Sequence, residues 1–216
     1  MSPTTTALRR RAHDRRRAAE QIILDAVQAL LATKEFRELT VEDVMATTGL
    51  TRTSFYRYFP DLDAALLRWL AILGDDLRRC ADRWLQDASS GIESGVELVT
   101  LYKDHGRLLL AFEQAAGAGT EIDEAWHAVI QSFIDRYSDF IVELRRRRWT
   151  NVEQPEQTAR ALVCMTERYL LETYGRGPAV DVDVAARTLA EIWQRALFSS
   201  QITKPPADLS HPSTDP

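Results

Sequence analysis

Apolar residues recur every three or four positions along almost the whole chain, and no long stretch alternates with period two. The clearest stripe lies in residues 18–33, where the apolar positions are Ile22, Ile23, Ala26, Val27, Leu30 and Leu31. Such spacing places side chains on one face of an α-helix, whereas a half-buried strand needs alternation. The pattern therefore predicts an all-α fold.

Nine helices are expected from these stripes and from the residues that interrupt them. They cover about 18–33, 40–49, 51–58, 61–88, 93–104, 107–116, 121–149, 155–174 and 182–199. Gly106 is expected to separate the fifth helix from the sixth, because glycine disfavours a helix interior. Pro155 suits a first helical turn, where a missing N–H breaks no hydrogen bond.

The two ends of the chain differ from the helical middle. Residues 1–17 carry six arginines and one aspartate, so we expect a basic flexible arm there. Residues 201–216 are rich in proline and polar side chains, which predicts a disordered tail. Between these ends, residues 18–60 form a candidate helix-turn-helix domain and residues 61–200 a larger helical body.

The most specific motif lies between Thr40 and Phe59. Thr40-Val-Glu-Asp43 is a capping-box pattern, which predicts that a helix starts there. Gly49 is expected to end that helix, since a tight turn needs a positive φ that glycine tolerates. Thr51 can cap a second short helix, whose hydroxyl and guanidinium groups suit phosphates and base edges. The same pattern also fits an α–α corner with an exposed polar face.

The net charge first argues against a nucleic-acid partner, and its distribution reverses that conclusion. The chain of 216 residues has a formal net charge of −5 at pH 7. Residues 1–60 hold 10 basic and 7 acidic residues, a net +3, whereas the remainder holds 17 basic and 25 acidic residues, a net −8. A basic head on an acidic body indicates a polyanionic partner at one end.

The length fits a single domain, or one large domain with a small one attached. Cys80 and Cys164 are far apart, which excludes a disulfide scaffold and a CxxC site and fits a reducing cytoplasm. No stretch reaches the ~18–20 apolar residues of a membrane span, and the arginine-rich start lacks an apolar signal region. We therefore expect a cytoplasmic protein without a membrane partner.

The helix-turn-helix segment resembles the DNA-binding signature of TetR-family transcriptional regulators. It reads Leu39-Thr-Val-Glu-Asp-Val-Met-Ala-Thr-Thr-Gly49-Leu-Thr-Arg-Thr-Ser-Phe-Tyr-Arg-Tyr-Phe-Pro60. In the body, Met165-Thr-Glu-Arg-Tyr169 and Glu191-Ile-Trp193 resemble strings of the family's ethionamide-activator repressor subgroup. The resemblance implies a nine-helix fold with a three-helix DNA-binding head and a C-terminal body for ligand binding and dimerisation.

The resemblance also implies a mechanism. A homodimer, formed by the last two helices, represses transcription at a palindromic DNA operator. A small, largely apolar effector binds in the body and moves the helix that begins at Asp61, directly after the recognition helix, so that the dimer leaves the DNA.

On this resemblance, the DNA contacts come from the motif and from the basic arm. They are Thr40, Thr51, Arg52, Thr53, Ser54, Tyr56, Arg57, Tyr58, Arg15, Arg16 and Arg17. The arm can equally be a solubilising tail. Two positions depart from the family pattern: Met45 stands where a small residue is usual, and Leu62 replaces a lysine that commonly lies near a phosphate. We expect Arg57 and the arm to compensate for that missing contact.

An aromatic helix face is the candidate wall of a ligand pocket. Trp126, Ile130, Phe133 and Tyr137 lie three or four residues apart. Aromatic side chains with polar atoms suit an apolar cavity that makes a few hydrogen bonds to its ligand. With residues of other helices, the candidate set is Leu98, Tyr102, Phe112, Trp126, Ile130, Phe133, Tyr137, Thr166, Tyr169 and Trp193. Each of them alone could be an ordinary core residue.

The last two helices carry more apolar residues than one core needs, which indicates a homodimer interface. These residues are Ala159, Leu162, Val163, Thr166, Tyr169 and Leu170 in the first helix, and Val182, Leu189, Ile192, Trp193, Ala196 and Leu197 in the second. The alternative is that both stripes face the core of the monomer.

Enzyme signatures are incomplete in this sequence. The four histidines have no metal-ligand spacing, and Gly117-Ala-Gly119 lacks the third glycine and the preceding strand of a dinucleotide loop. Asp75-Asp76 lacks the third carboxylate of a DDxxD motif, because Arg79 stands in its place. We therefore expect no catalytic residue, metal or cofactor. The other remaining hypothesis is an all-helical small-molecule sensor or adaptor without strong operator binding.

Overall fold

The computed structural model describes residues 3–86, 92–116 and 120–198. Its α-helices are α1 (Pro3–Leu31), α2 (Val41–Thr48), α3 (Arg52–Tyr58), α4 (Leu62–Gln86), α5 (Ile92–Ala115), α6 (Glu121–Arg146), α7 (Pro155–Leu170) and α8 (Val182–Leu197). A 3-10 helix, Phe36–Glu38, precedes α2, and a π-helical segment called η2 (Leu171–Arg176) continues α7. The all-α prediction is confirmed for the described residues, which form eight α-helices rather than nine.

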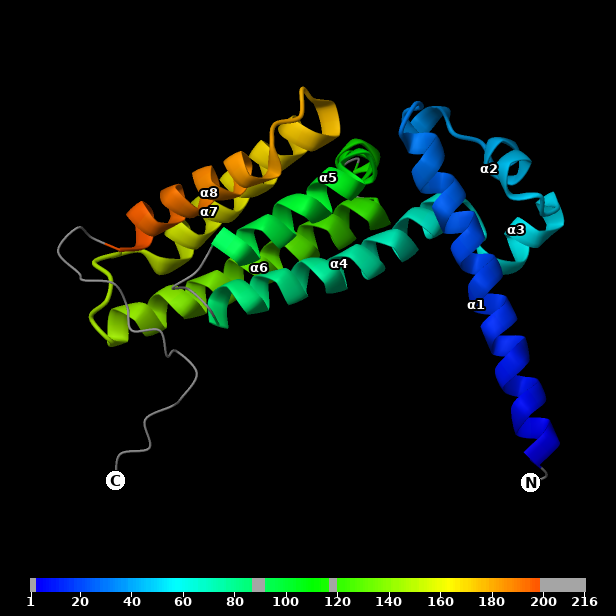
Figure 1. Cartoon of the computed structure of the whole chain (residues 1–216), viewed down its shortest axis with the longest axis horizontal. Coiled ribbons are helices and arrows are strands. Elements are labelled where there is room, and N and C mark those ends of the chain that lie inside the picture. Colours follow the sequence, from blue (N-terminus) through cyan, green and yellow to red (C-terminus); the bar gives the residue numbers. More distant parts are fainter. Residues whose placement is uncertain (1–2, 87–91, 117–119, 199–216) are drawn as a thin grey trace.

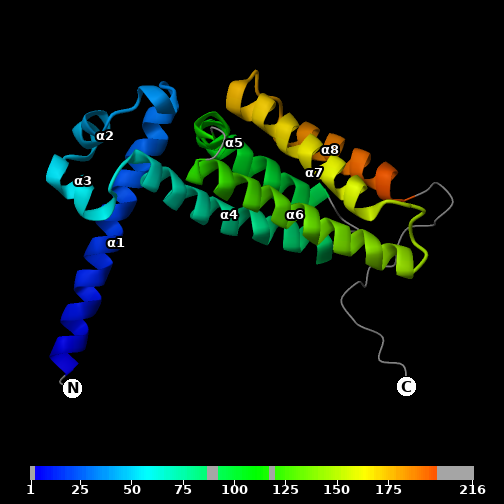
Figure 2. The same ribbon diagram turned by 180° about the vertical axis from the view of Figure 1, so that it is seen from behind.

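The helices form a small head and a longer body (Figure 1). The head consists of α1, α2 and α3, and the body is a bundle of α4 to α8. Within the body, α4 packs against α5 and α6, α6 packs against α7, and α5 packs against α8 and η2. Figure 2 shows from the opposite side that α4 leaves the head and continues into the bundle. This helix is therefore a covalent connection between the two parts.

The predicted break at Gly106 is wrong, because α5 runs without interruption from Ile92 to Ala115. A Cβ atom at Gly106 would lie 2.5 Å from the carbonyl oxygen of Tyr174 and 2.6 Å from its carbonyl carbon. Glycine at this position therefore lets the backbone of η2 approach α5 closely. The residue marks a helix contact and not a helix end.

The expected flexible arm is helical in this structure. Residues 3–17 form the N-terminal half of α1, with Pro3 at the first helical position. Between Thr4 and Leu31 the sequence has no glycine or proline and is rich in alanine, leucine and arginine, which favour helix. The predicted disordered tail, 201–216, lies outside the described residues.

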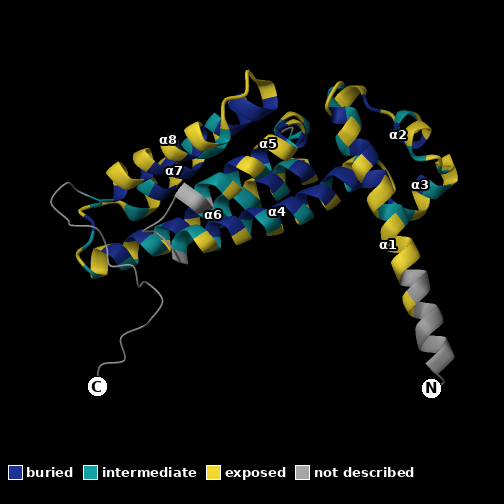
Figure 3. Cartoon of the chain, in the orientation of Figure 1, coloured by how far each residue is buried: buried dark blue, intermediate teal, exposed yellow. Residues whose placement is uncertain are grey.

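Buried aliphatic and aromatic side chains form the core of the head. Val44 and Phe55 are fully buried, and Met45 and Phe59 are 6% and 5% exposed. The longer Met45 side chain is thus accommodated inside the head. The buried residues of α2 and α3 share one core cluster with those of α1, and Figure 3 shows that much of the remaining surface of α2 and α3 is exposed. The motif can therefore present its polar residues on a rigid support.

Candidate DNA interface and ligand cavity

The start of α2 is fixed by the predicted capping box. The Asp43 amide donates to the Thr40 hydroxyl at 3.1 Å, and the Thr40 amide donates to the Asp43 carboxylate at 3.0 Å. Lys34 donates to the same carboxylate at 2.8 Å. The hydrogen bonds from Lys34 and Thr40 lower the pKa of Asp43 to about 2. Gly49 follows α2 with a φ of 68°, as expected for the turn.

Helix α3 presents a polar face above a buried anchor. The exposed residues of the predicted DNA-contact set in and beside it are Thr51, Arg52, Thr53, Tyr56 and Arg57, while Ser54 and Tyr58 are half-buried. Phe55 is completely buried on the opposite face and packs edge-on against Tyr56. The arrangement directs hydroxyl and guanidinium groups outward, which suits a major groove.

Arg52 is held by two neighbouring side chains. Its guanidinium forms an ion pair with Glu42 of α2 and donates to the Tyr56 hydroxyl at 3.4 Å. The hydrogen bond with Tyr56 and the charge of Glu42 raise the pKa of Arg52 above its ordinary value. Both partners are exposed, so DNA would have to compete with Glu42 for this arginine.

The other predicted DNA contacts lie at the edges of the head. Thr40 is exposed, but its hydroxyl also donates to Asp43 at 2.8 Å, so it serves the capping box here. Arg15, Arg16 and Arg17 are exposed residues of α1. The N-terminal part of this helix projects beyond α2 and α3 (Figures 1 and 2). Because consecutive residues of an α-helix lie ~100° apart, these three arginines point in different directions around α1.

Leu62, which departs from the family pattern, packs partly buried against the apolar core. Its neighbour Asp61 accepts a hydrogen bond from the Ala64 amide at 2.8 Å and so caps α4. The first turn of α4 is therefore specialised for packing and capping.

The body holds a largely apolar cavity between α4, α5, α6, α7 and α8. The volume open to the centres of water-sized molecules is about 90 Å³. Its lining residues are Leu77, Cys80, Ala81, Trp84, Gly95, Leu98, Tyr102, Trp126, Ile130, Phe133, Tyr137, Val163, Thr166, Glu167, Ala186, Leu189, Ala190 and Trp193. Eight of the predicted ligand-binding residues are among them: Leu98, Tyr102, Trp126, Ile130, Phe133, Tyr137, Thr166 and Trp193.

Three aromatic rings pack together in the cavity wall. The ring centroids of Tyr137 and Trp193 are 4.7 Å apart, and Trp84 lies 5.0 Å from Trp193 and 5.4 Å from Tyr137. The Trp193 indole donates to the Thr166 hydroxyl at 2.9 Å, which joins α8 to α7. Burial raises the pKa of Tyr137 above its ordinary value, so this phenol stays neutral at physiological pH. The wall is thus closely packed and largely apolar.

Phe112 and Tyr169 do not line the cavity. Phe112 is fully buried and stacks on Trp126, with centroids 5.9 Å apart, so it supports a wall residue from behind. Tyr169 is half-buried against the core. At ~100° per residue, it lies about 110° around α7 from the face formed by Val163, Thr166 and Glu167.

The residues that sequence reasoning missed are mainly those of α4 and the small residues of α5 and α8. Leu77, Ala81 and Trp84 follow a three- and four-residue spacing that could have identified this face of α4. Gly95, Ala186 and Ala190 are small residues that line the cavity and leave space in it. Small residues of this kind have no sequence pattern that would identify them as pocket residues.

Helix α1 is tied to the body by hydrogen bonds to its backbone. The Trp69 indole of α4 donates to the Leu24 carbonyl at 2.8 Å. From α5, Arg107 donates to the Leu31 carbonyl of α1 at 3.2 Å and to the Gly175 carbonyl of η2 at 3.3 Å. Arg107 therefore bridges the end of the first head helix and the segment that follows α7.

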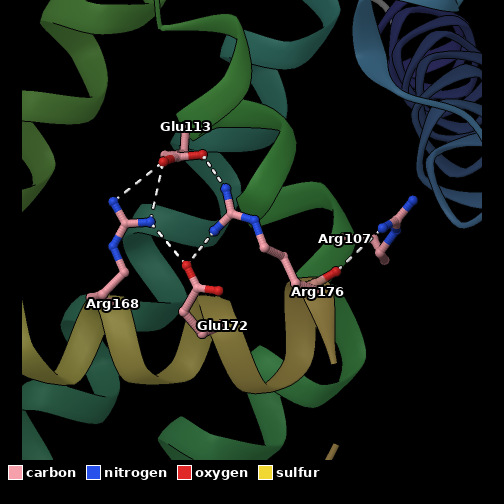
Figure 4. A network of polar contacts seen from close by, with 6 residues as sticks. Arg107, Glu113, Arg168, Glu172 and Arg176 are labelled. Carbon is pink, nitrogen blue, oxygen red and sulfur yellow. Dashed lines mark hydrogen bonds and ion pairs between the residues drawn. The ribbon is translucent and has the colours of Figure 1, made fainter. Parts of the chain in front are cut away.

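A network of charges fastens that segment to α5 (Figure 4). Arg168 of α7 donates to Glu113 at 3.3 Å and to Glu172 at 3.2 Å. Arg176 donates to Glu113 at 3.1 Å and to Glu172 at 2.5 Å. Because α7 also lines the cavity, this network and the two Arg107 hydrogen bonds link the cavity helix to α1 through the backbone of η2.

Two family models match the sequence. The model described as bacterial regulatory proteins of the tetR family covers residues 23–66. The model described as the C-terminal domain of the transcriptional regulator EthR covers residues 91–199. The first includes α2 and α3, and the second includes α5 to α8 with the main part of the cavity. Within the described residues, no helix is long and apolar enough to cross a membrane.

Curated relatives and solved structures agree with these matches. The HTH-type transcriptional regulator EthR of Mycolicibacterium smegmatis is 28% identical over 91% of this chain and 97% of its own. EthR of Mycobacterium tuberculosis is 26% identical over 83% and 87%. The crystal structure of native NalD, the secondary repressor of the MexAB-OprM multidrug efflux pump in Pseudomonas aeruginosa, has a TM-score of 0.68 at 20% identity, over 85% and 98% of the two chains.

Proposed function

This chain belongs to the TetR family of DNA-binding transcriptional regulators, with a C-terminal domain of the EthR type, and from this premise we propose that it is an effector-released repressor. It is a regulator and not an enzyme. The observation that carries the proposal is the pairing of an exposed polar recognition helix, α3, with a largely apolar cavity in the same chain. Helices α4 and α5 connect the two.

On this proposal, α3 enters the major groove and Arg52 reads a base edge. A bidentate arginine–guanine contact contributes about 1–3 kcal/mol of discrimination. Thr51, Tyr56 and the exposed arginines of α1 contact phosphates. In a homodimer, two such helices about 34–36 Å apart meet both halves of a palindrome.

The outer face of α8 supports dimerisation. Val184, Thr188, Ile192 and Ala196 are exposed at four-residue intervals, and Val184 and Ile192 are 56% and 38% exposed. Most of the stripe predicted from sequence instead faces the interior of the monomer, including Leu162, Leu189, Trp193 and Leu197. We therefore place the dimer contact of α8 on the Val184–Ile192 side.

The effector acts on this proposal by binding better to the form of the body that cannot hold DNA. A ligand that widens the cavity displaces α4 and α7, which both line it. Helix α4 begins directly after α3, and α7 reaches α1 through η2 and Arg107. Either displacement changes the position of the recognition helix relative to its dimer mate.

The DNA-binding part is tested by fluorescence anisotropy with DNA from upstream of the gene that encodes this chain. We expect salt-dependent binding, and Arg52→Ala should weaken it about 5-fold to 150-fold. Arg160→Ala is the matched control, because Arg160 lies on the surface of the body and pairs with Glu156. Equal affinity of the Arg52→Ala variant and the wild type would contradict the assigned recognition helix.

The role of the arginines in α1 is tested by salt dependence. Replacing Arg15, Arg16 and Arg17 by alanine preserves helix propensity. If all three contact phosphates, the slope of log affinity against log salt should fall by up to about 2.7. An unchanged slope would show that this part of α1 does not touch DNA.

Absence of binding by the wild-type chain to any upstream fragment would favour a sensor or adaptor without operator binding.

A further inference from the structure

One charged side chain lines the otherwise apolar cavity. Glu167 of α7 is half-buried, and it is the one Asp, Glu, Lys or Arg among the described lining residues. Burial raises its pKa above the ordinary value, and the neighbouring charge of Arg168 acts in the opposite direction. A carboxylate in such surroundings loses hydration that apolar side chains cannot replace.

Glu167 has no partner within the part of the chain that the structure describes. No hydrogen bond or ion pair joins it to a described residue, although Arg168 is next to it in sequence. Arg168 points instead to Glu113 and Glu172, as Figure 4 shows. The carboxylates around Arg168 are therefore compensated, and the one that lines the cavity is not.

The other polar groups of the cavity do not provide a partner for the Glu167 carboxylate. The Thr166 hydroxyl accepts a hydrogen bond from the Trp193 indole at 2.9 Å and makes none with Glu167. The Tyr102 phenol is buried, and the negative charge of Glu167 adds to burial in raising the pKa of Tyr102. Both side chains line the same cavity.

The surroundings of Glu167 suit a cation. Aromatic faces attract an ammonium group through their electron-rich centres, and the cavity is lined by Tyr102, Trp126, Phe133 and other rings. A positive charge would restore the electrostatic partner that Glu167 lacks, and it would do so where the dielectric constant is low. An anion would be repelled, and a neutral ligand would dehydrate the carboxylate further.

We propose that the effector is a hydrophobic amine, whose protonated nitrogen binds to Glu167 while its apolar part fills the aromatic cavity. The inference rests on the proposed function, since it assigns a chemical class to the ligand of the same cavity. Glu167 is on this view the residue that selects cationic over neutral ligands.

Phenylbutylamine and phenylbutanol test this assignment, because they share a carbon skeleton and differ in the terminal group. Binding is followed by calorimetry and by the fluorescence of Trp84, Trp126 and Trp193, which line the cavity. At neutral pH we expect the amine to bind the wild type about 10-fold to 100-fold more tightly than the alcohol. Glu167→Gln should abolish that preference and leave alcohol binding in place.

Two variants control for folding and for general charge effects. Glu156→Gln removes a carboxylate from the exposed start of α7, so it should keep the full preference for the amine. Glu167→Asp retains the charge and should keep part of the preference. If circular dichroism shows that Glu167→Gln does not fold, the amine assignment is still tested by the ratio of amine to alcohol affinity in the wild type and in Glu167→Asp.

The outcomes separate this inference from the proposed function. Equal binding of both compounds to the wild type, or a preference that persists in Glu167→Gln, would overturn the amine assignment and leave an apolar effector in place. Failure of both compounds to bind would overturn the amine assignment and also count against the cavity as an effector site.

Discussion

Alanine at Gly106 is expected to disrupt the contact between α5 and η2. The new Cβ would lie 2.5 Å from the Tyr174 carbonyl oxygen and 3.0 Å from the Gly175 amide nitrogen. The shorter distance is about 1 Å inside van der Waals contact, and the atoms opposite are backbone, which cannot rotate away. Overpacking of this kind costs about 1–3 kcal/mol.

A second glycine in a helix provides the matched control. At Gly74 of α4, a Cβ would lie 3.5 Å from the Arg78 guanidinium and 3.7 Å from Val129, which are ordinary contacts. Both substitutions gain about 1 kcal/mol of helix propensity. That gain cancels when the variants are compared, so Gly106→Ala should be about 1–3 kcal/mol less stable than Gly74→Ala.

The assay is thermal unfolding followed by circular dichroism, with both variants at the same protein concentration. At ~2–4 °C per kcal/mol, the midpoint of Gly106→Ala should lie about 2–12 °C below that of Gly74→Ala. Equal midpoints, or a higher midpoint for Gly106→Ala, would refute the close approach of η2 to α5.

Three further substitutions probe the head and its connection to the body. Thr40→Ala removes the α2 cap and should lower the free energy of unfolding by about 0.5–2 kcal/mol in urea titrations; no loss would contradict the capping box. Glu42→Gln releases Arg52 and should tighten DNA binding about 2-fold to 5-fold in anisotropy titrations, whereas weaker binding would contradict the competition between Glu42 and DNA. Arg107→Met keeps the apolar stem but removes both hydrogen bonds to backbone carbonyls, so the effector should bind normally and release DNA less well. Unchanged release would exclude this arginine from the coupling.

The head was predictable because its determinants are local in sequence. The Thr40–Asp43 capping box, the turn at Gly49 and the buried Phe55 all act within a few residues of one another. Four of the predicted pocket residues, Trp126, Ile130, Phe133 and Tyr137, line the cavity for a related reason, since they form one helix face. Helical periodicity identifies such faces without knowledge of their neighbours.

The features that sequence could not supply depend on distant segments. Gly106 is read as a helix break until the backbone of η2, nearly 70 residues later, is seen against it. Arg52 offers a free guanidinium in sequence, but in the structure Glu42 of the preceding helix occupies it. The isolation of Glu167 likewise becomes visible only when Arg168 is found paired with Glu113.

In the proposed mechanism, the cavity and the DNA interface are energetically coupled. The most direct test of this coupling has two parts. DNA affinity is measured by anisotropy with and without a saturating compound that quenches the fluorescence of the cavity tryptophans. The affinity of that compound is then measured for free protein and for DNA-bound protein. Reciprocity requires both affinities to fall by the same factor, typically about 5-fold to 150-fold for allosteric proteins. DNA affinity that does not change at saturation would contradict the claim.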